Sequence, residues 1–446
     1  MTGPSLPYLT AGPGLRAVFK ARWEDFEVEE LPARDPEGEG DHLWLEIEKH
    51  GLTTPRAASD LARALGVKPS SVGYAGMKDA RAIARQWMSV EHVDPDRALA
   101  RGIPRIRVLR AVRHRRKLRR GWHEGNRFRV LLRPLPDTQP VEAAADDWAG
   151  ERLAPVKEAL GVLADLGVPN YYGPQRFGTR GDTWEVGRAL AREEWNEAAA
   201  LIAGRPLRAG DPRVDPAEGI FPDTGDILRA RDLFDEGRYQ ESFEAWPRGF
   251  GQCARLARAM ERTGGDAARA LPVVGKRMLR LYASAYQSWL FNAVLAERIR
   301  MGAMARLLTG DLAWKHDTEA LFLVEDPAAE QLRADAFEVS PTGPLVGMRM
   351  KEPAGRVVAL ESRVLEAMGL RRQELESRVM APLTGRRRPL RFRLRGLGVE
   401  PGADALGPYL ELRFTLPPGC YATAVLREVG KGRIEEGSSP SGDAVD

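Results

Sequence analysis

The pattern of apolar and polar positions divides the chain into a strand-containing beginning, a helical middle and a strand-containing end. Alternation of apolar and polar residues at the beginning places Phe26 and Val28 on one face of a strand. Pro55 opens a predicted helix that ends at Leu65, with apolar residues along one stripe. The predicted strands are 16–30, 42–47, 128–132, 321–324, 390–394 and 411–416, and a late helix is predicted over 421–428.

Long helical patterns fill the middle, at 138–167, 182–203, 229–262 and 277–300. Strands and helices mix without a regular β-α-β alternation, which favours an α+β fold over a doubly wound one. We therefore predict one discontinuous domain that carries an insertion. The expected parts are 1–153 and 341–436 for this domain, 154–340 for the insertion, and 437–446 for a disordered polar tail.

Length and composition indicate a soluble protein of two domains. The 446 residues exceed what one core usually serves, and 43% are hydrophobic and 29% charged. No apolar run is long enough to span a bilayer, and the first residues do not resemble a signal peptide, so we expect a cytoplasmic protein. The two cysteines form no C-x-x-C pair, the six histidines are scattered, and no phosphate-binding loop is present. We expect chemistry without a metal or nucleotide cofactor.

The stretch Gly73–Ser89 is the candidate for the chemistry. Its glycine-rich start predicts a strand that runs into a tight turn, with Lys78 and Asp79 at the turn. Residues 80–88 could continue as a helix or as a second strand. An aspartate held there by flexible backbone could act as a nucleophile or base, or it could simply cap a helix.

A basic run suggests a nucleic-acid partner. Six of the eight residues from 113 to 120 are Lys or Arg, followed directly by glycines and aromatics, and 386–388 is a second arginine cluster. Such a mix can neutralise phosphates while bases stack, although a solvated loop is the alternative. The RNA-binding candidates in the run are Arg113, His114, Arg115, Arg116 and Lys117.

Residues 168–178 are too rich in glycine, proline and aromatics for a helix. They form either an elaborate packed loop or a platform that presents Arg176 and aromatic edges to RNA. Both interpretations stay open from the residues.

Four motifs, in order along the chain, resemble the TruD family of pseudouridine synthases, which isomerise uridine in tRNA. Residues 170–178 are similar to its NYFGxQRFG-type signature, residues 113–128 to its middle motif and residues 421–428 to its C-terminal motif. The stretch similar to its catalytic motif is Gly76-x-Lys78-Asp79-x-x-Ala82-x-x-x-Gln86. The resemblance spans about residues 19–429. One departure is Ala84, where the family usually has Thr.

The resemblance implies a pseudouridine synthase fold, a mixed and largely antiparallel sheet with helices, carrying a mainly helical inserted domain. It implies Asp79 as the catalytic aspartate and Lys20 as a cation beside it; a surface lysine on a strand is the alternative for Lys20. The residues that match positions holding the flipped uridine are Phe26, Asn126, Phe128 and Tyr421. The partner is then tRNA, position 13 is the uridine that the family indicates, and no cofactor is needed. The competing hypothesis is a non-catalytic tRNA-binding or folding factor.

Overall fold

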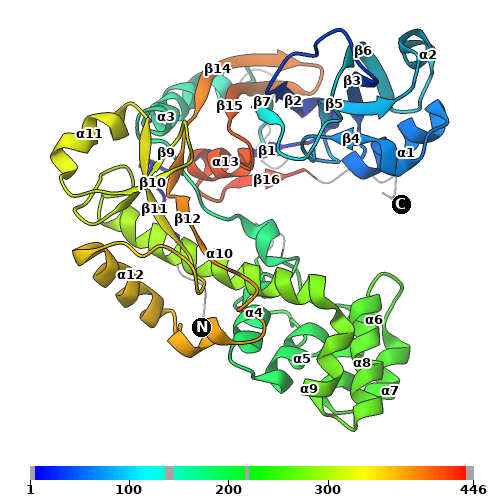
Figure 1. Ribbon diagram of the computed structural model, residues 1–446, viewed down its shortest axis with the longest axis vertical. Coiled ribbons are helices and arrows are strands. Elements are labelled where there is room, and N and C mark those ends of the chain that lie inside the picture. Colours follow the sequence, from blue (N-terminus) through cyan, green and yellow to red (C-terminus); the bar gives the residue numbers. More distant parts are fainter. Residues whose placement is uncertain (1–5, 136–144, 216–219, 438–446) are drawn as a thin grey trace. The chain divides into compact units, whose positions relative to one another are not determined.

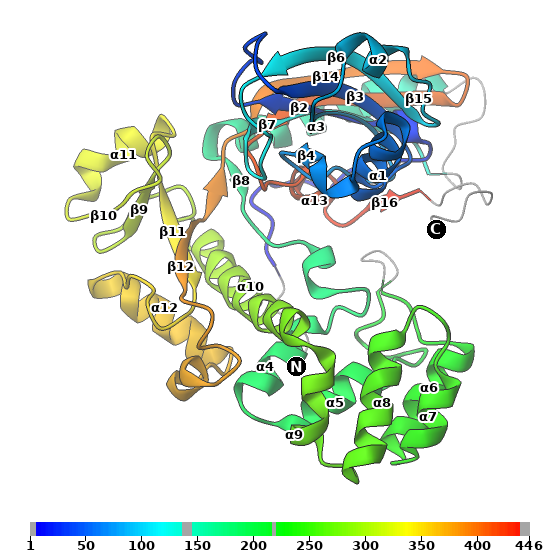
Figure 2. The ribbon, with the colours of Figure 1, turned by 45° about the vertical axis from the view of Figure 1, so that its right-hand side comes forward.

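The computed structural model describes residues 6–135, 145–215 and 220–437 (Figures 1 and 2). The chain forms two compact units, which we call the sheet unit (Thr10–Val168 with Phe392–Asp446) and the helix-rich unit (Met1–Leu9 with Pro169–Arg391). It passes between them at the short strands β8 (Val168–Pro169) and β13 (Arg391–Phe392). Among the described residues, no helix combines the length and apolar content that crossing a membrane requires.

The sheet unit is built on an eight-stranded sheet in the order β14-β15-β7-β2-β5-β3-β6, with β4 added beside β5. The pair β2–β5 is parallel, and the other neighbours in this order are antiparallel. This mixed, largely antiparallel sheet confirms the α+β prediction. The strands are β2 (Phe26–Pro32), β3 (His42–His50), β4 (Gly73–Tyr74), β5 (Ile83–Glu91), β6 (Ile106–His114), β7 (His123–Leu132), β14 (Arg395–Asp404) and β15 (Gly407–Leu416).

Further elements complete the sheet unit. The helix α3 packs along β14 and β15 (Figure 1), and β1 pairs in parallel with β16. The apolar stripe of α1 packs against Leu45, Ile47 and Met88 on one face of the sheet. These elements are β1 (Ala17–Phe19), α1 (Thr54–Leu65), α2 (Pro95–Ala100), α3 (Ala145–Leu166), α13 (Ala422–Gly430) and β16 (Ile434–Glu436), with short 3-10 helices at Trp23–Asp25 and Pro69–Ser71.

The long helix α10 (Lys276–Arg300) runs through the helix-rich unit. It packs on α4 and α12 and on β11, which belongs to a four-stranded sheet in the order β10-β9-β11-β12, and short helices gather near its start (Figure 2). The elements are α4 (Thr183–Ala191), α5 (Trp195–Ala203), α6 (Gly225–Asp235), α7 (Tyr239–Ala245), α8 (Gly251–Thr263), α9 (Ala267–Ala270), β9 (Leu312–Lys315), β10 (Leu321–Leu323), α11 (Pro327–Asp335), β11 (Val339–Leu345), α12 (Gly355–Ala367) and β12 (Arg386–Pro389), with 3-10 helices at Pro174–Phe177, Leu271–Val274 and Arg372–Glu376.

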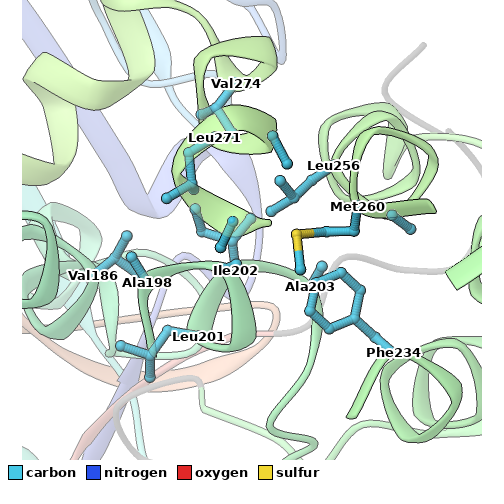
Figure 3. Packing of buried hydrophobic residues seen from close by; sticks show 14 of the residues in the cluster. Val186, Ala198, Leu201, Ile202, Ala203, Phe234, Leu256, Met260, Leu271 and Val274 are labelled. Atoms are coloured by element: carbon cyan, nitrogen blue, oxygen red, sulfur yellow. The ribbon is translucent and has the colours of Figure 1, made fainter. Parts of the chain in front are cut away.

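An apolar cluster joins the short helices of this unit to one another. Figure 3 shows side chains from several helices, among them Val186, Ile202, Leu256 and Leu271, converging on one core. Met260 of α8 also points into it. The short helices around this cluster therefore form one packed group rather than a loose extension.

The structure differs from several sequence predictions. The pattern 182–203 is two helices and 229–262 is three, because short turns interrupt them. The strands β9, β11, β12 and β14 were not predicted. In β11 two prolines obscure the strand pattern, and in β14 three glycines and one proline do so. The expected domain boundaries also differ: 154 lies inside α3 and 340 inside β11, whereas the chain passes from one unit to the other at 168/169 and 391/392.

The predicted disordered tail, 437–446, begins one residue early. Gly437 is ordered by a hydrogen bond from its N–H to the carbonyl of Phe19, at 2.8 Å. Residues 438–446 lie outside the described residues, so the prediction for them stays a prediction.

Candidate active site

Asp79 lies in the loop between β4 and β5, in the sheet unit. Its Oδ2 is 2.5 Å from the Lys20 ammonium nitrogen, and its Oδ1 accepts the Arg81 N–H at 2.9 Å. The side chain is 34% exposed, so a substrate can reach the carboxylate. The loop continues into the strand β5, so the helix-cap interpretation of Asp79 is wrong and the second-strand alternative for 80–88 holds.

Lys20 follows β1 directly and is buried, with 4% of its side chain exposed. Its ammonium group also contacts the Glu436 carboxylate at 3.1 Å and lies 4.6 Å from the centre of the Phe26 ring. The backbone of Lys20 is left-handed, with φ of 56°, a conformation that costs a non-glycine residue about 1–3 kcal/mol and often marks functional sites. Lys20 is therefore no surface lysine; the fold holds it against Asp79.

A buried ion pair fixes the loop that carries Asp79. The Lys78 ammonium and the Glu30 carboxylate are 2.5 Å apart, and 3% and 1% of their side chains are exposed. Glu30 also accepts the Trp87 N–H at 3.2 Å, and the Lys78 N–H is donated to the Thr54 hydroxyl at 2.8 Å. A Cβ on Gly76 would lie 2.6 Å from the Lys78 nitrogen, so only glycine fits there without a shift.

Lys49 supports the same loop from inside the sheet unit. Its ammonium group is fully buried and donates to the backbone carbonyls of Asp79, at 2.7 Å, and Leu52, at 2.5 Å. Burial lowers the pKa of Lys49 to about 8, although the charge of Asp79 acts in the opposite direction. Because Lys49 holds the Asp79 backbone rather than the carboxylate, it acts as a positioning group.

Phe26, Phe128 and Asn126 lie on one face of neighbouring strands. The Phe26 and Phe128 rings meet edge to face with centroids 5.9 Å apart, and Phe128 stacks on Phe414 at 5.5 Å. Both rings are largely buried, at 5% and 7% exposed. The Asn126 Oδ1 is buried and has no hydrogen-bond partner within the described part of the chain. A buried amide oxygen without a hydrogen bond costs free energy, and a ligand that donates a hydrogen bond to it removes this cost.

Two further positions from the motifs are Tyr421 and Ala84. Tyr421 precedes α13 and is 57% exposed, in contrast to the buried Phe26 and Phe128. It follows the turn after β15, whose Leu416 pairs with Asn126. Ala84 is fully buried on β5, opposite Val28 and Lys49, so a threonine hydroxyl there would lie on the same face as the Phe128 ring.

The basic run is split between surface and core. Arg115 and Arg116 are exposed, Arg115 pairs with Glu39, and Lys117 donates to the Ser70 carbonyl at 3.0 Å. Arg113 is partly exposed at the end of β6. The RNA-binding role of these four stays a prediction.

His114 differs from its neighbours because it is buried. Its ring lies 4.1 Å from that of Trp44, and its Nδ1 accepts the Glu37 N–H at 3.3 Å. Burial lowers the pKa of His114, which favours the uncharged form of the ring. The position favours packing over a phosphate contact.

Arg176 lies in the helix-rich unit, in the 3-10 turn Pro174–Phe177. Its guanidinium donates to the hydroxyls of Ser284 and, at 3.0 Å, Ser288, both on α10. It also lies 5.7 Å from the Tyr172 ring. Residues 168–178 are thus a packed loop whose arginine is already held by the protein, and its contact with RNA stays a prediction.

Sequence reasoning missed three charged residues of the site. Glu30 and Lys49 each stand two residues after a buried apolar residue of the same strand, in Phe26-Val28-Glu30 and Leu45-Ile47-Lys49. This spacing places a charged residue on the buried face, and the sequence alone could have shown it. Glu436 gave no such signal, because its strand has three residues and precedes the tail. Within the described ranges, no group of three or more His, Cys, Asp or Glu side chains is arranged to hold a metal ion.

Comparison with known proteins gives a consistent result. The family model described as tRNA pseudouridine synthase D (TruD) matches residues 5–429. The proteins named tRNA pseudouridine synthase D from Geobacter sulfurreducens and Geotalea daltonii are 42% and 40% identical, over 95% of this chain and 96% and 99% of their own. A crystal structure of a Methanosarcina mazei protein assigned as a tRNA pseudouridine synthase D superimposes with a TM-score of 0.82 at 25% identity, covering 97% of this chain and 99% of that one. The chain therefore belongs to the tRNA pseudouridine synthase D (TruD) family, a family of isomerases.

Proposed function

We propose that this protein converts a uridine of tRNA, at position 13, into pseudouridine, with Asp79 as the nucleophile. The observation that carries this proposal is the reachable Asp79 carboxylate, fixed by Lys20 and by the Arg81 N–H, on a loop that Lys78 and Lys49 anchor. Family membership supplies the reaction and the substrate class.

The reaction detaches uracil from C1′ of the ribose and reattaches it through C5. The bond from N1 to C1′ breaks, Asp79 adds covalently to the nucleotide, and the ring turns before the bond from C5 to C1′ forms. The C5 proton is lost and N1 gains one, so product and substrate have the same atoms. Since nothing is oxidised or transferred to another molecule, we propose that neither a metal nor a nucleotide cofactor takes part.

The uridine must leave its stack to reach Asp79. We propose that Phe26 and Phe128 line the site for the flipped base and that Tyr421 covers it. The unpaired Asn126 Oδ1 can accept a hydrogen bond from the uracil edge, which would give this buried oxygen the partner that it lacks. A cytoplasmic location follows from the proposed substrate, tRNA.

The test compares Asp79→Asn with wild type on unmodified tRNA that carries either U13 or C13. Carbodiimide labelling measures pseudouridine, and the buffer contains EDTA and monovalent salt. We expect product at position 13 with wild type and the U13 tRNA, and a loss of at least 1000-fold with Asp79→Asn, because an amide is not a nucleophile. The control Asp96→Asn changes an exposed aspartate on α2 and should stay fully active.

Activity of Asp79→Asn within tenfold of wild type would remove Asp79 from the mechanism. Tight tRNA binding by wild type without any product would favour the tRNA-binding factor instead. Product at another uridine would keep the reaction and discard position 13.

A further inference from the structure

An unusually basic segment lies in the helix-rich unit. From Arg248 to Arg280 the chain has eight basic residues and two acidic ones, Glu261 and Asp266. All eight basic residues are exposed, and none forms an ion pair within the described part of the chain. They are Arg248, Arg255, Arg258, Arg262, Arg269, Lys276, Arg277 and Arg280.

Neighbouring arginines of the same unit behave differently. Arg205 pairs with Glu197, Arg208 with Asp232, and Arg238 with both Glu236 and Glu241. An ordinary surface mixes charges of both signs in this way. The segment 248–280 has only two carboxylates for its eight basic residues, and no ion pair joins them within the described part of the chain, so its positive charge is available to a partner.

Three of the arginines form one face of α8. Arg255, Arg258 and Arg262 have the spacing i, i+3 and i+7, which places them within about 60° around the helix. Leu256 and Met260 lie on the opposite side and point into the apolar cluster (Figure 3). We call Arg255, Arg258 and Arg262 the α8 arginine face. Because the core fixes the rotation of α8, this face must point outward.

The α8 arginine face has a length suited to a nucleic-acid backbone. Seven residues of helix span about 10 Å, and about six phosphate charges lie along that length of a duplex axis. Arginine also binds phosphate in a planar, two-pronged geometry. The Arg258 guanidinium lies over the Phe243 ring at 5.3 Å, a contact that restrains its side chain and leaves its charge unpaired.

We propose that the α8 arginine face binds the phosphate backbone of the tRNA substrate, remote along the chain from the residues around Asp79. The inference rests on the proposed function for the identity of the RNA. It gives the helix-rich unit a role of its own: it adds affinity through charge, without reading sequence and without contributing to the chemistry.

The test is a triple variant, Arg255→Gln, Arg258→Gln and Arg262→Gln, with binding of fluorescent tRNA measured at several salt concentrations. Each lost phosphate contact should reduce the slope of log affinity against log salt by about 0.7 to 0.9, so we expect a reduction of roughly two to three. If the affinities are equal at 1 M salt, the variant should bind about 100- to 500-fold more weakly at 0.1 M salt. The triple change to Lys should keep the slope near that of wild type.

The matched control changes Arg205, Arg208 and Arg238 to Gln, which removes the same charge from ion-paired arginines of the same unit. This control should bind tRNA almost as wild type does. Equal weakening by both triple variants would assign the effect to net charge and overturn the proposal. An unchanged salt slope would make the face a solvated surface, and binding to anionic lipid vesicles in place of tRNA would make it a membrane contact; either result overturns the proposal.

Binding does not depend on turnover, so the result separates this inference from the proposed reaction. If no pseudouridine forms but the α8 variant loses tRNA affinity, the binding face stands and the proposed function fails. In the opposite case, product forms normally and the salt slope is unchanged in the variant, so only the binding face fails. Thermal unfolding of both triple variants should match wild type, because these side chains lie outside the core.

Discussion

The residues around Asp79 combine three lysines with different tasks. Lys20 contacts the carboxylate, Lys78 ties the loop to Glu30, and Lys49 holds the Asp79 backbone. All three are buried. Burying a cation costs free energy of folding unless the cation is paired. Three buried lysines around one accessible carboxylate therefore indicate that this region positions Asp79 rather than stabilises the fold.

Lys49 leads to a prediction about pH. Its pKa of about 8 in the folded protein lies below the usual 10.5, so between these values the unfolded chain binds more protons and the stability contribution of Lys49 rises with pH. From pH 7.5 to 9.5, wild type should gain about 2 kcal/mol in unfolding free energy relative to Lys49→Met. Urea unfolding of both proteins at the two pH values measures this. Identical pH dependence in both would show that Lys49 does not titrate there.

At the scale of elements, the loop between β4 and β5 depends on β2 through the pair Lys78–Glu30. Lys78→Met leaves the Glu30 carboxylate buried without its partner and should cost about 3–5 kcal/mol of stability. Adding Glu30→Gln removes the stranded charge and keeps an acceptor for the Trp87 N–H, so the double variant should regain most of that stability. Urea unfolding of the four proteins of this cycle measures the coupling, and additive losses would contradict it.

The same cycle separates stability from positioning. Pseudouridine formation should stay low in the double variant, because the loop that carries Asp79 has lost its anchor. Recovery of activity together with stability would mean that the ion pair does not orient Asp79.

Much of the sheet could be predicted from sequence, because β2 alternates buried and half-buried residues and because β3 and β7 are rich in buried apolar residues. The surroundings of the β12 arginines could not be predicted from the sequence. Residues 386–388 suggested a polyanion partner, but Arg387 is buried against the Glu361 carboxylate at 2.8 Å, and Arg388 lies over the Tyr172 ring at 4.3 Å. These partners are far away in sequence, so local charge density could not identify them. Asp79 could be identified because it lies in a local motif. Glu436, which shares the Lys20 ammonium group with Asp79, could not be identified because it is far away in sequence.

At the scale of the whole molecule, the two ends of the helix-rich insertion meet. The Asn170 N–H donates to the Leu390 carbonyl at 2.9 Å, and the Asn170 side chain donates to the Pro389 carbonyl at 2.8 Å. The parts 10–168 and 392–437 share one sheet, through the pair β7–β15. We propose that the sheet unit is a domain that can fold without the insertion.

This proposal predicts that joining Val168 to Phe392 with a four-residue Gly-Ser linker yields a protein that unfolds cooperatively in urea. A control joins residues 153 and 341 instead, which cuts α3 and retains part of β11. The control should not fold, because it cannot complete either unit. Similar behaviour of the two shortened chains would contradict the boundary at 168/169 and 391/392.

The contact between Lys20 and Glu436 has a consequence for the timing of biosynthesis. The two residues are 416 positions apart, so at typical synthesis rates about 20 to 80 s separate their translation. Until Glu436 emerges from the ribosome, β1 lacks β16 beside it, and Lys20 lacks one of its two carboxylates. A nascent or prematurely terminated chain can fold most of its sheet and still carry an incomplete site. The assembly of the site around Asp79 therefore has to wait until β16 has been translated.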